Sequence, residues 1–135
     1  MMMQRARRDG VVCVVGTGEN RWPMVHVDDL ANLYVLAVEK APRGTLLHAC
    51  PVRGIRVREI AAAIAKVMGI PEKVRPWPLE DARRTLGSFA DALALDAQAS
   101  GTLAERLLGW RPTKPSVLEE IEHGSYARIA DATAT

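Results

Sequence analysis

A short stretch that combines an amide, a guanidinium and an indole is the most distinctive place for chemistry in this sequence. Asn20, Arg21 and Trp22 stand together ahead of Pro23, between two apolar runs. Arginine can hold a phosphate or a carboxylate through two parallel hydrogen bonds, and tryptophan offers a flat face for stacking. The stretch is therefore a candidate site for an anionic ligand. The alternative is a loop pinned by packing of Trp22, with Arg21 solvated.

Two glycines ahead of this stretch suggest a dinucleotide-binding turn but do not complete one. Gly16 and Gly18 follow an apolar run, as the first two positions of G-x-G-x-x-G would, but the third position is Arg21. That fingerprint works because a helix N-terminus meets the pyrophosphate and the third glycine permits close packing. Here a Trp-Pro pair follows instead, so we interpret the two glycines as part of a turn.

The histidines and paired carboxylates have structural interpretations that need fewer assumptions than catalysis. His26 and His48 lie in apolar runs, where a hydrogen-bonded structural histidine is typical. Asp28 and Asp29 could form an acid/base pair, but they also open a helical pattern. Either carboxylate can accept hydrogen bonds from the free N–H groups of a first helical turn. No nucleophile triad or zinc-ligand spacing accompanies them, so we expect Asp29 to be a helix cap.

The elements that position these residues follow from the apolar pattern. The β-branched run at 11–15 predicts a buried strand, and 24–27 and 45–50 predict two further strands. Between the last two, apolar residues at helical spacing predict a helix that opens at Asp28 and ends before Pro42. A strand, a helix and a strand in this order favour an α/β arrangement.

The remainder of the chain is predicted to be mainly helical. The prolines around Trp77 make that segment extended, and the Ser116-to-Glu119 spacing is typical of a capping box. We divide the chain into an N-terminal basic helix, a main body and a frayed tail, at residues 1–10, 11–126 and 127–135. Helices are expected at 58–68, 79–86, 89–95, 102–108 and 116–124.

Length and composition exclude several classes of protein. The 135 residues fit one domain, and 48% hydrophobic with 25% charged residues is typical of a globular chain. A net charge of +2 is too small to predict a nucleic acid or an anionic membrane as partner. The N-terminus lacks the apolar core of a secretory signal, and no apolar stretch approaches the roughly 20 residues that span a bilayer. We therefore expect a cytoplasmic protein whose two cysteines, Cys13 and Cys50, are free thiols.

Several motifs, taken together, resemble one family. The run at 16–31 resembles the segment G-x-G-x-N-x-W-P-x-V-H-V-x-D-L-A of extended and atypical short-chain dehydrogenases, the NAD-dependent epimerase/dehydratase family. Further motifs follow in the family's order, and the resemblance covers roughly residues 5–126. They are A-P-x-G at 41–44, R-E-I-A at 58–61, A-L-x-L-D at 92–96, L-G-W-x-P at 108–112 and G-S-Y at 124–126.

The resemblance implies the C-terminal portion of a Rossmann-type short-chain dehydrogenase fold, with few short strands and a small helix-rich substrate-binding lobe. It also implies NAD or NADP as cofactor and a nucleotide sugar or related molecule as substrate. In the family, the N-terminal half carries a G-x-x-G-x-x-G cofactor loop and a Tyr-x-x-x-Lys catalytic pair. Both are absent from this sequence. We therefore expect a truncated or split chain that is not catalytically competent alone and binds no cofactor by itself.

The resemblance also assigns roles to particular residues. Asn20, Arg21 and Trp22 are candidate substrate contacts, and either Arg21 or Trp22 falls where family members hold a substrate phosphate. Residues 45–50 would be a strand returning to the Rossmann sheet. The expected partners are a small-molecule substrate and an N-terminal half. The alternative is a stand-alone, self-associating binding protein derived from such an enzyme.

Overall fold

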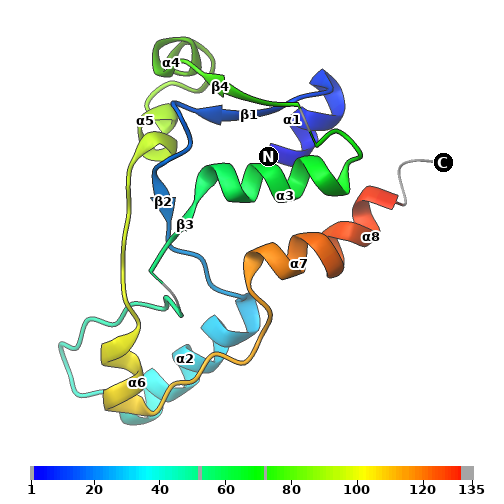
Figure 1. Cartoon of the computed structure of the whole chain (residues 1–135). Coiled ribbons are helices and arrows are strands. Elements are labelled where there is room, and N and C mark those ends of the chain that lie inside the picture. The colour runs from blue at the N-terminus through cyan, green and yellow to red at the C-terminus, as the bar shows by residue number, and fades with distance from the viewer. Residues whose placement is uncertain (1, 52, 72, 132–135) are drawn as a thin grey trace.

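The computed structural model describes residues 2–51, 53–71 and 73–131. Within these ranges the fold is a helix-rich α/β arrangement with two short two-stranded sheets (Figure 1), which confirms the predicted fold class. The elements in chain order are α1 (Met2–Asp9), β1 (Val12–Val15), β2 (Arg21–Trp22), α2 (Val27–Lys40), β3 (Ile55–Arg56), α3 (Val57–Val67), β4 (Val74–Trp77), α4 (Leu79–Leu86), α5 (Phe89–Ala94), α6 (Thr102–Leu108), α7 (Val117–His123) and α8 (Ser125–Asp131).

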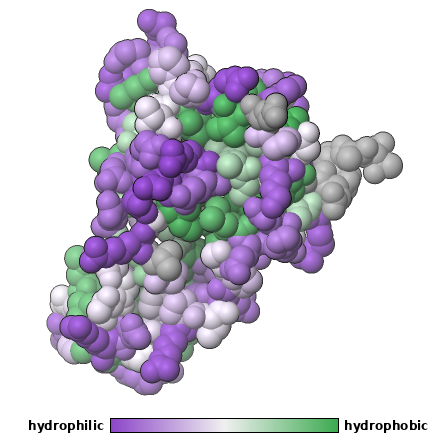
Figure 2. All heavy atoms as spheres, in the orientation of Figure 1, coloured by the Kyte–Doolittle hydropathy of each residue, from purple (hydrophilic) through white to green (hydrophobic). Residues whose placement is uncertain are grey.

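The main core lies between the β1–β4 pair and α3. The two strands run parallel, and Val12 pairs with Val74. Parallel strands need a long crossover, and here the crossover contains α3. Ala61 and Ala65 are fully buried, and such small side chains let the α3 backbone approach the strands closely. Figure 2 shows that hydrophobic residues remain visible across the middle of one face, between more polar ends.

The turn that links β1 to β2 also caps the N-terminus of α3 through backbone hydrogen bonds. The carbonyls of Gly18 and Asn20 accept hydrogen bonds from the backbone N–H groups of Arg58 and Val57, at 2.9 and 3.0 Å. These two bonds satisfy N–H groups that a side-chain cap would otherwise have to reach, and α3 has no such cap. A Cβ on Gly18 would lie 3.1 Å from the Arg58 Cβ, so the turn requires glycine there. The interpretation of the two glycines as a turn is confirmed.

A second, smaller core joins α2 to α6 and the segment after it (Figure 1). Trp110 is almost completely buried in this core, and its indole N–H donates to the Asp29 carbonyl at 2.9 Å. The buried Asp29 carboxylate accepts hydrogen bonds from the backbone N–H groups of Thr113 and Lys114, both at 3.0 Å. Asp29 thus joins α2 to the end of the L-G-W-x-P motif.

The prediction that Asp29 caps its own helix is therefore wrong. The helix begins at Val27, which places Asp29 inside the first turn and turns its carboxylate toward the other segment. The cap is His26, whose Nδ1 accepts a hydrogen bond from the Asp28 N–H at 3.2 Å. His26 is therefore a hydrogen-bonded structural histidine, as predicted, but it caps a helix and does not lie in a strand.

Two predicted strands are also wrong. Residues 45–50 form no ladder with any other described residue, and their backbone is irregular. A strand is defined by hydrogen bonds to a neighbour, so a run of suitable residues is not sufficient. Residues 24–26 are likewise irregular and lead into α2, and the strand in this region is β2, two residues earlier.

The helix boundaries in the second half follow the predictions closely. Gly109 ends α6 in the left-handed conformation, with φ of 67°. Ser116 and Glu119 form the predicted capping box at the start of α7. Residues 127–131 of the predicted frayed tail lie in α8, and residues 132–135 lie outside the described ranges. Across the described residues, no helix is long and apolar enough to cross a membrane.

Candidate functional site

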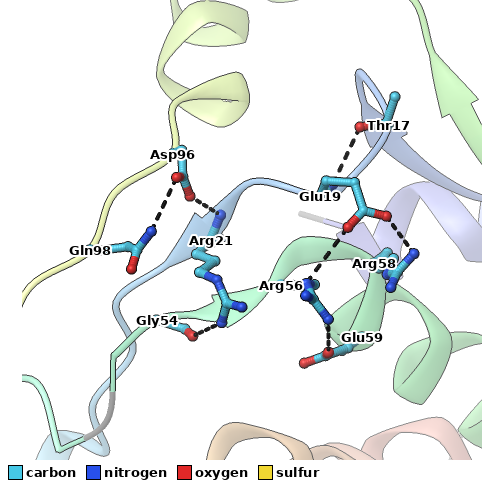
Figure 3. Close-up of polar contacts among 9 residues, drawn as sticks. All are labelled: Thr17, Glu19, Arg21, Gly54, Arg56, Arg58, Glu59, Asp96 and Gln98. Carbon is cyan, nitrogen blue, oxygen red and sulfur yellow. Dashed lines mark hydrogen bonds and ion pairs between the residues drawn. The ribbon is translucent and has the colours of Figure 1, made fainter.

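Arg21, the central residue of the candidate site, is held by two segments that lie far apart in the sequence. On one side it pairs with Arg56 in the β2–β3 sheet. On the other side its N–H donates to Asp96 Oδ1 at 2.7 Å (Figure 3). Its carbonyl accepts from the Ala97 N–H at 2.9 Å. Arg21 therefore has neighbours on both edges, although β2 contains only two residues.

The side chains of Asn20 and Trp22 converge on one backbone carbonyl. Asn20 Nδ2 donates to Leu93 O at 2.9 Å and to Leu95 O at 3.2 Å. The Trp22 indole N–H donates to the same Leu93 carbonyl at 3.2 Å. The hydrogen-bond donors of both side chains thus hold residues 93–98, which we call the strap. This geometry favours the anchoring role that the sequence left open for Trp22.

The guanidinium of Arg21 has a different environment. Its Nη1 donates to the Gly54 carbonyl at 3.1 Å, and among the described residues no carboxylate forms an ion pair with it. A guanidinium has five N–H donors, so most of its donor capacity remains for another molecule. Of the three candidate residues, Arg21 is the charged one, and no carboxylate of the described residues neutralises it.

The neighbouring arginines on β3 and α3, Arg56 and Arg58, are already paired. Glu19 accepts a hydrogen bond from Arg58, and its other oxygen lies 3.6 Å from Arg56 Nε. Arg56 also lies 3.6 Å from Glu59 (Figure 3). The sequence analysis missed this network, because nothing in the spacing of Glu19 and α3 indicates that they meet. The network neutralises the α3 side of the site and leaves Arg21 as its cationic group.

Two cavities lie elsewhere in the molecule. One, of about 520 Å³, lies where the residues before α2 face α7 and the start of α8, and its walls include His26, Lys114 and Tyr126. Hydrogen bonds from Ser125 lower the pKa of Glu120 in its wall. A second, of about 270 Å³, lies beside Trp110 and Cys50. None of the three candidate residues lines either of these cavities, and all three are half-buried.

Metal and thiol chemistry have no visible support in the described ranges. No group of three or more histidine, cysteine or acidic side chains is placed there to hold a metal ion. Cys13 and Cys50 are both free, as predicted. Cys50 is buried, and this burial raises the pKa of its thiol. A raised pKa disfavours the reactive thiolate, so Cys50 has the properties of a core residue.

Curated proteins similar in sequence are all much longer than this chain. An uncharacterised protein of Schizosaccharomyces pombe, C2A9.02, is 36% identical over 126 residues, which are 93% of this chain and 42% of that protein. An uncharacterised protein of Saccharomyces cerevisiae, YLL056C, is 31% identical over 90% of this chain and 40% of its own length. A UDP-glucose 4-epimerase of Halalkalibacterium halodurans is 32% identical over 73% of this chain, which corresponds to 28% of that protein. No protein-family model matches the chain.

Two solved structures with the same fold are sugar-nucleotide enzymes by their descriptions. DesIV, a dTDP-glucose 4,6-dehydratase of Streptomyces venezuelae with NAD and TYD bound, matches 97% of this chain and 37% of its own, with a TM-score of 0.69 and 20% identity. A UDP-glucuronic acid 4-epimerase of Bacillus cereus matches 95% of this chain and 38% of its own, with a TM-score of 0.66 and 16% identity. The chain spans less than half of each. The fold therefore matches the C-terminal part of epimerase/dehydratase chains, and the sequence likeness to a UDP-glucose 4-epimerase supports the resemblance to the NAD-dependent epimerase/dehydratase family.

Proposed function

We propose that this chain is the substrate-binding C-terminal region of an NAD(P)-dependent epimerase/dehydratase-like oxidoreductase that acts on a nucleotide sugar or a related molecule. The observation that carries the proposal is the match of 97% of the chain to DesIV at a TM-score of 0.69. That enzyme was solved with NAD and TYD, and the Bacillus cereus epimerase with UDP-glucuronic acid and NAD. A nucleoside diphosphate is therefore the first ligand to test.

Within this proposal, Arg21 holds a phosphate and its two neighbours shape the surface around it. The Arg21 guanidinium has one hydrogen bond, to Gly54 O, among the described residues, and its planar fork matches a phosphate in two-bonded geometry. Both side-chain N–H groups of Asn20 donate to the strap, so its Oδ1 is the atom that can accept a hydrogen bond from a ligand hydroxyl. Trp22 is partly buried and packs against the main core, so it supports this surface.

The proposed division of labour leaves the redox chemistry to another segment. The sequence carries neither the glycine-rich loop nor the Tyr-x-x-x-Lys pair. A nicotinamide cofactor, when bound, supplies hydride transfer, and the protein around it supplies binding and orientation. We propose that this chain contributes substrate binding only, and that it neither binds NAD(P) tightly nor catalyses alone.

Calorimetric titration tests both parts of the proposal. UDP and dTDP should bind the chain, and Arg21→Ala should weaken that binding by about tenfold or more, because a charge-assisted hydrogen bond contributes about 1.5–3 kcal/mol. Arg106→Ala, on exposed α6, is the matched control and should bind as the unaltered chain does. Equal affinity in both variants would contradict the role of Arg21. Micromolar binding of NAD⁺ or NADPH would contradict the division of labour.

A second candidate function rests on an exposed apolar stripe of α2. Val27, Tyr34 and Val38 are 69%, 66% and 88% exposed, and Val35 lies beside them at 56%. These positions share one helix face, because residues three, four and seven apart are neighbours on a helix. Such a stripe fits the alternative of a stand-alone, self-associating binding protein. Light scattering decides it: an oligomer that Val38→Glu converts to a monomer supports self-association, and a monomer at all concentrations rejects it.

A further inference from the structure

We infer that Asp96 is the positioning residue of the candidate site, and that it fixes Arg21 without neutralising it. The inference rests on the proposed function and deepens it. Asp96 Oδ1 accepts the Arg21 backbone N–H at 2.7 Å, and its Oδ2 accepts from Gln98 Nε2 at 3.2 Å (Figure 3). The carboxylate thus contacts the main chain of Arg21 and not its guanidinium.

The first step of the argument is that β2 is too short to hold Arg21 by itself. It contains two residues and pairs only with the two residues of β3. Strands in globular proteins usually contain about five or six residues in sheets of several strands. The strap completes the opposite edge, because Ala97 donates to the Arg21 carbonyl at 2.9 Å while Asp96 accepts its N–H. Both backbone hydrogen bonds of Arg21 are therefore made with the strap, and its pairing with Arg56 in the sheet adds none.

The second step concerns the kind of acceptor. In an ordinary ladder a backbone carbonyl accepts the N–H, so the residue type hardly matters. Here a side-chain carboxylate takes that place, and the position of Arg21 depends on the residue at 96. A hydrogen bond to a charged acceptor is also stronger than one to a neutral carbonyl. The structure therefore makes position 96 a determinant of where Arg21 lies.

The third step concerns the charge of the guanidinium. Glu19 sits on the guanidinium of Arg58 and cancels its charge, whereas Asp96 is bonded to the Arg21 backbone. The Arg21 side chain then extends to the Gly54 carbonyl, which approaches because residue 54 is glycine: a Cβ there would lie 2.9 Å from the Arg21 Cβ. Asp96 and Gly54 together aim the guanidinium while leaving its charge for an anionic ligand.

The experiment compares Asp96→Ala and Asp96→Asn with the unaltered chain, using UDP as the probe. Asp96→Ala should weaken UDP binding by about tenfold, and Asp96→Asn, which keeps a neutral acceptor, should recover most of that loss. The melting temperature should change little, because residue 96 is exposed. Asp81→Ala removes another exposed carboxylate, paired with Arg84, and is the control that should leave UDP binding unchanged.

A second measurement keeps the inference separate from the proposed function. The ¹⁵N–¹H NMR signals of the Arg21 amide and guanidinium can be followed without any ligand. In Asp96→Ala, amide exchange at Arg21 should speed up by about tenfold, and the guanidinium signal should shift. Unchanged Arg21 signals would overturn the inference whether or not UDP binds. Absence of UDP binding with shifted Arg21 signals would instead reject the proposed function and keep the positioning role.

Discussion

Replacement of Asp29 by asparagine tests the buried charged side chain that joins α2 to residues 113–114. The carboxylate is 2% exposed and accepts two backbone hydrogen bonds at 3.0 Å, from the N–H groups of Thr113 and Lys114. Asn has nearly the same shape but only one acceptor oxygen. In Asp29→Asn the amide nitrogen must therefore face one of the two N–H groups, and that partly buried group loses its partner.

The magnitude follows from the number of bonds. A hydrogen bond to a charged group contributes about 1.5–3 kcal/mol, and the bond that remains is weakened because its acceptor is now neutral. We therefore expect Asp29→Asn to lower the free energy of unfolding by about 2–4 kcal/mol. For a chain of this length, that loss corresponds to a fall of roughly 10 °C in melting temperature.

The neighbouring residue provides a matched control. Asp28 lies next in the chain, and its carboxylate forms an exposed ion pair with Lys114 Nζ at 3.1 Å. Exposed ion pairs contribute about 0.2–1 kcal/mol, so Asp28→Asn should change stability by less than about 1 kcal/mol. Urea unfolding followed by circular dichroism measures both variants. Equal losses in the two variants, or a loss below 1 kcal/mol in Asp29→Asn, would refute the assignment of Asp29 as a buried clamp.

Two further predictions concern the second core and the last helices. A Cβ on Gly101 would lie 2.7 Å from Trp110 Cζ3, so Gly101→Ala should cost about 1–3 kcal/mol and shift the tryptophan emission. Gly69→Ala, at a positive φ with open space around it, should leave that emission unchanged. Hydrogen bonds from the O–H and N–H of Ser125 hold the pKa of Glu120 below its ordinary 4.5. These bonds therefore stabilise the fold fully above pH 4.5. That stabilisation is lost as the pH falls through the lowered pKa of the folded state. Helicity measured from pH 7 to pH 3 should fall in the unaltered chain and fall less steeply in Ser125→Ala.

Local signals predicted the elements that are held by their own residues. The left-handed Gly109 and the capping box at Ser116 lie within a few residues of the boundaries that they set. The start of α3 had no such signal, because its partners are carbonyls near Gly18, about forty residues earlier. The same limit explains residues 45–50: their composition suits a strand, but a strand also needs a neighbour.

The candidate site shows this limit in a sharper form. Sequence motifs singled out the stretch from Asn20 to Trp22, and the structure shows that these residues do have specific polar partners. The partners themselves, Leu93 and Asp96, are more than seventy residues away and were not predicted. Residue types therefore drew attention to the stretch. Only the long-range contacts show that Asn20 and Trp22 hold the strap while the Arg21 guanidinium bonds to the Gly54 carbonyl.

The distance between the two halves of this site has a consequence for how the protein is made. The hydrogen bond between Arg21 and Asp96 joins residues 75 positions apart. A ribosome that adds about 5–20 residues per second needs roughly 4–15 s to synthesise that interval. During that time β2 has one open edge and Arg21 has no strap to fix it. The candidate surface around Arg21 is thus completed only after residue 96 has been synthesised, 75 positions after the residue that it fixes.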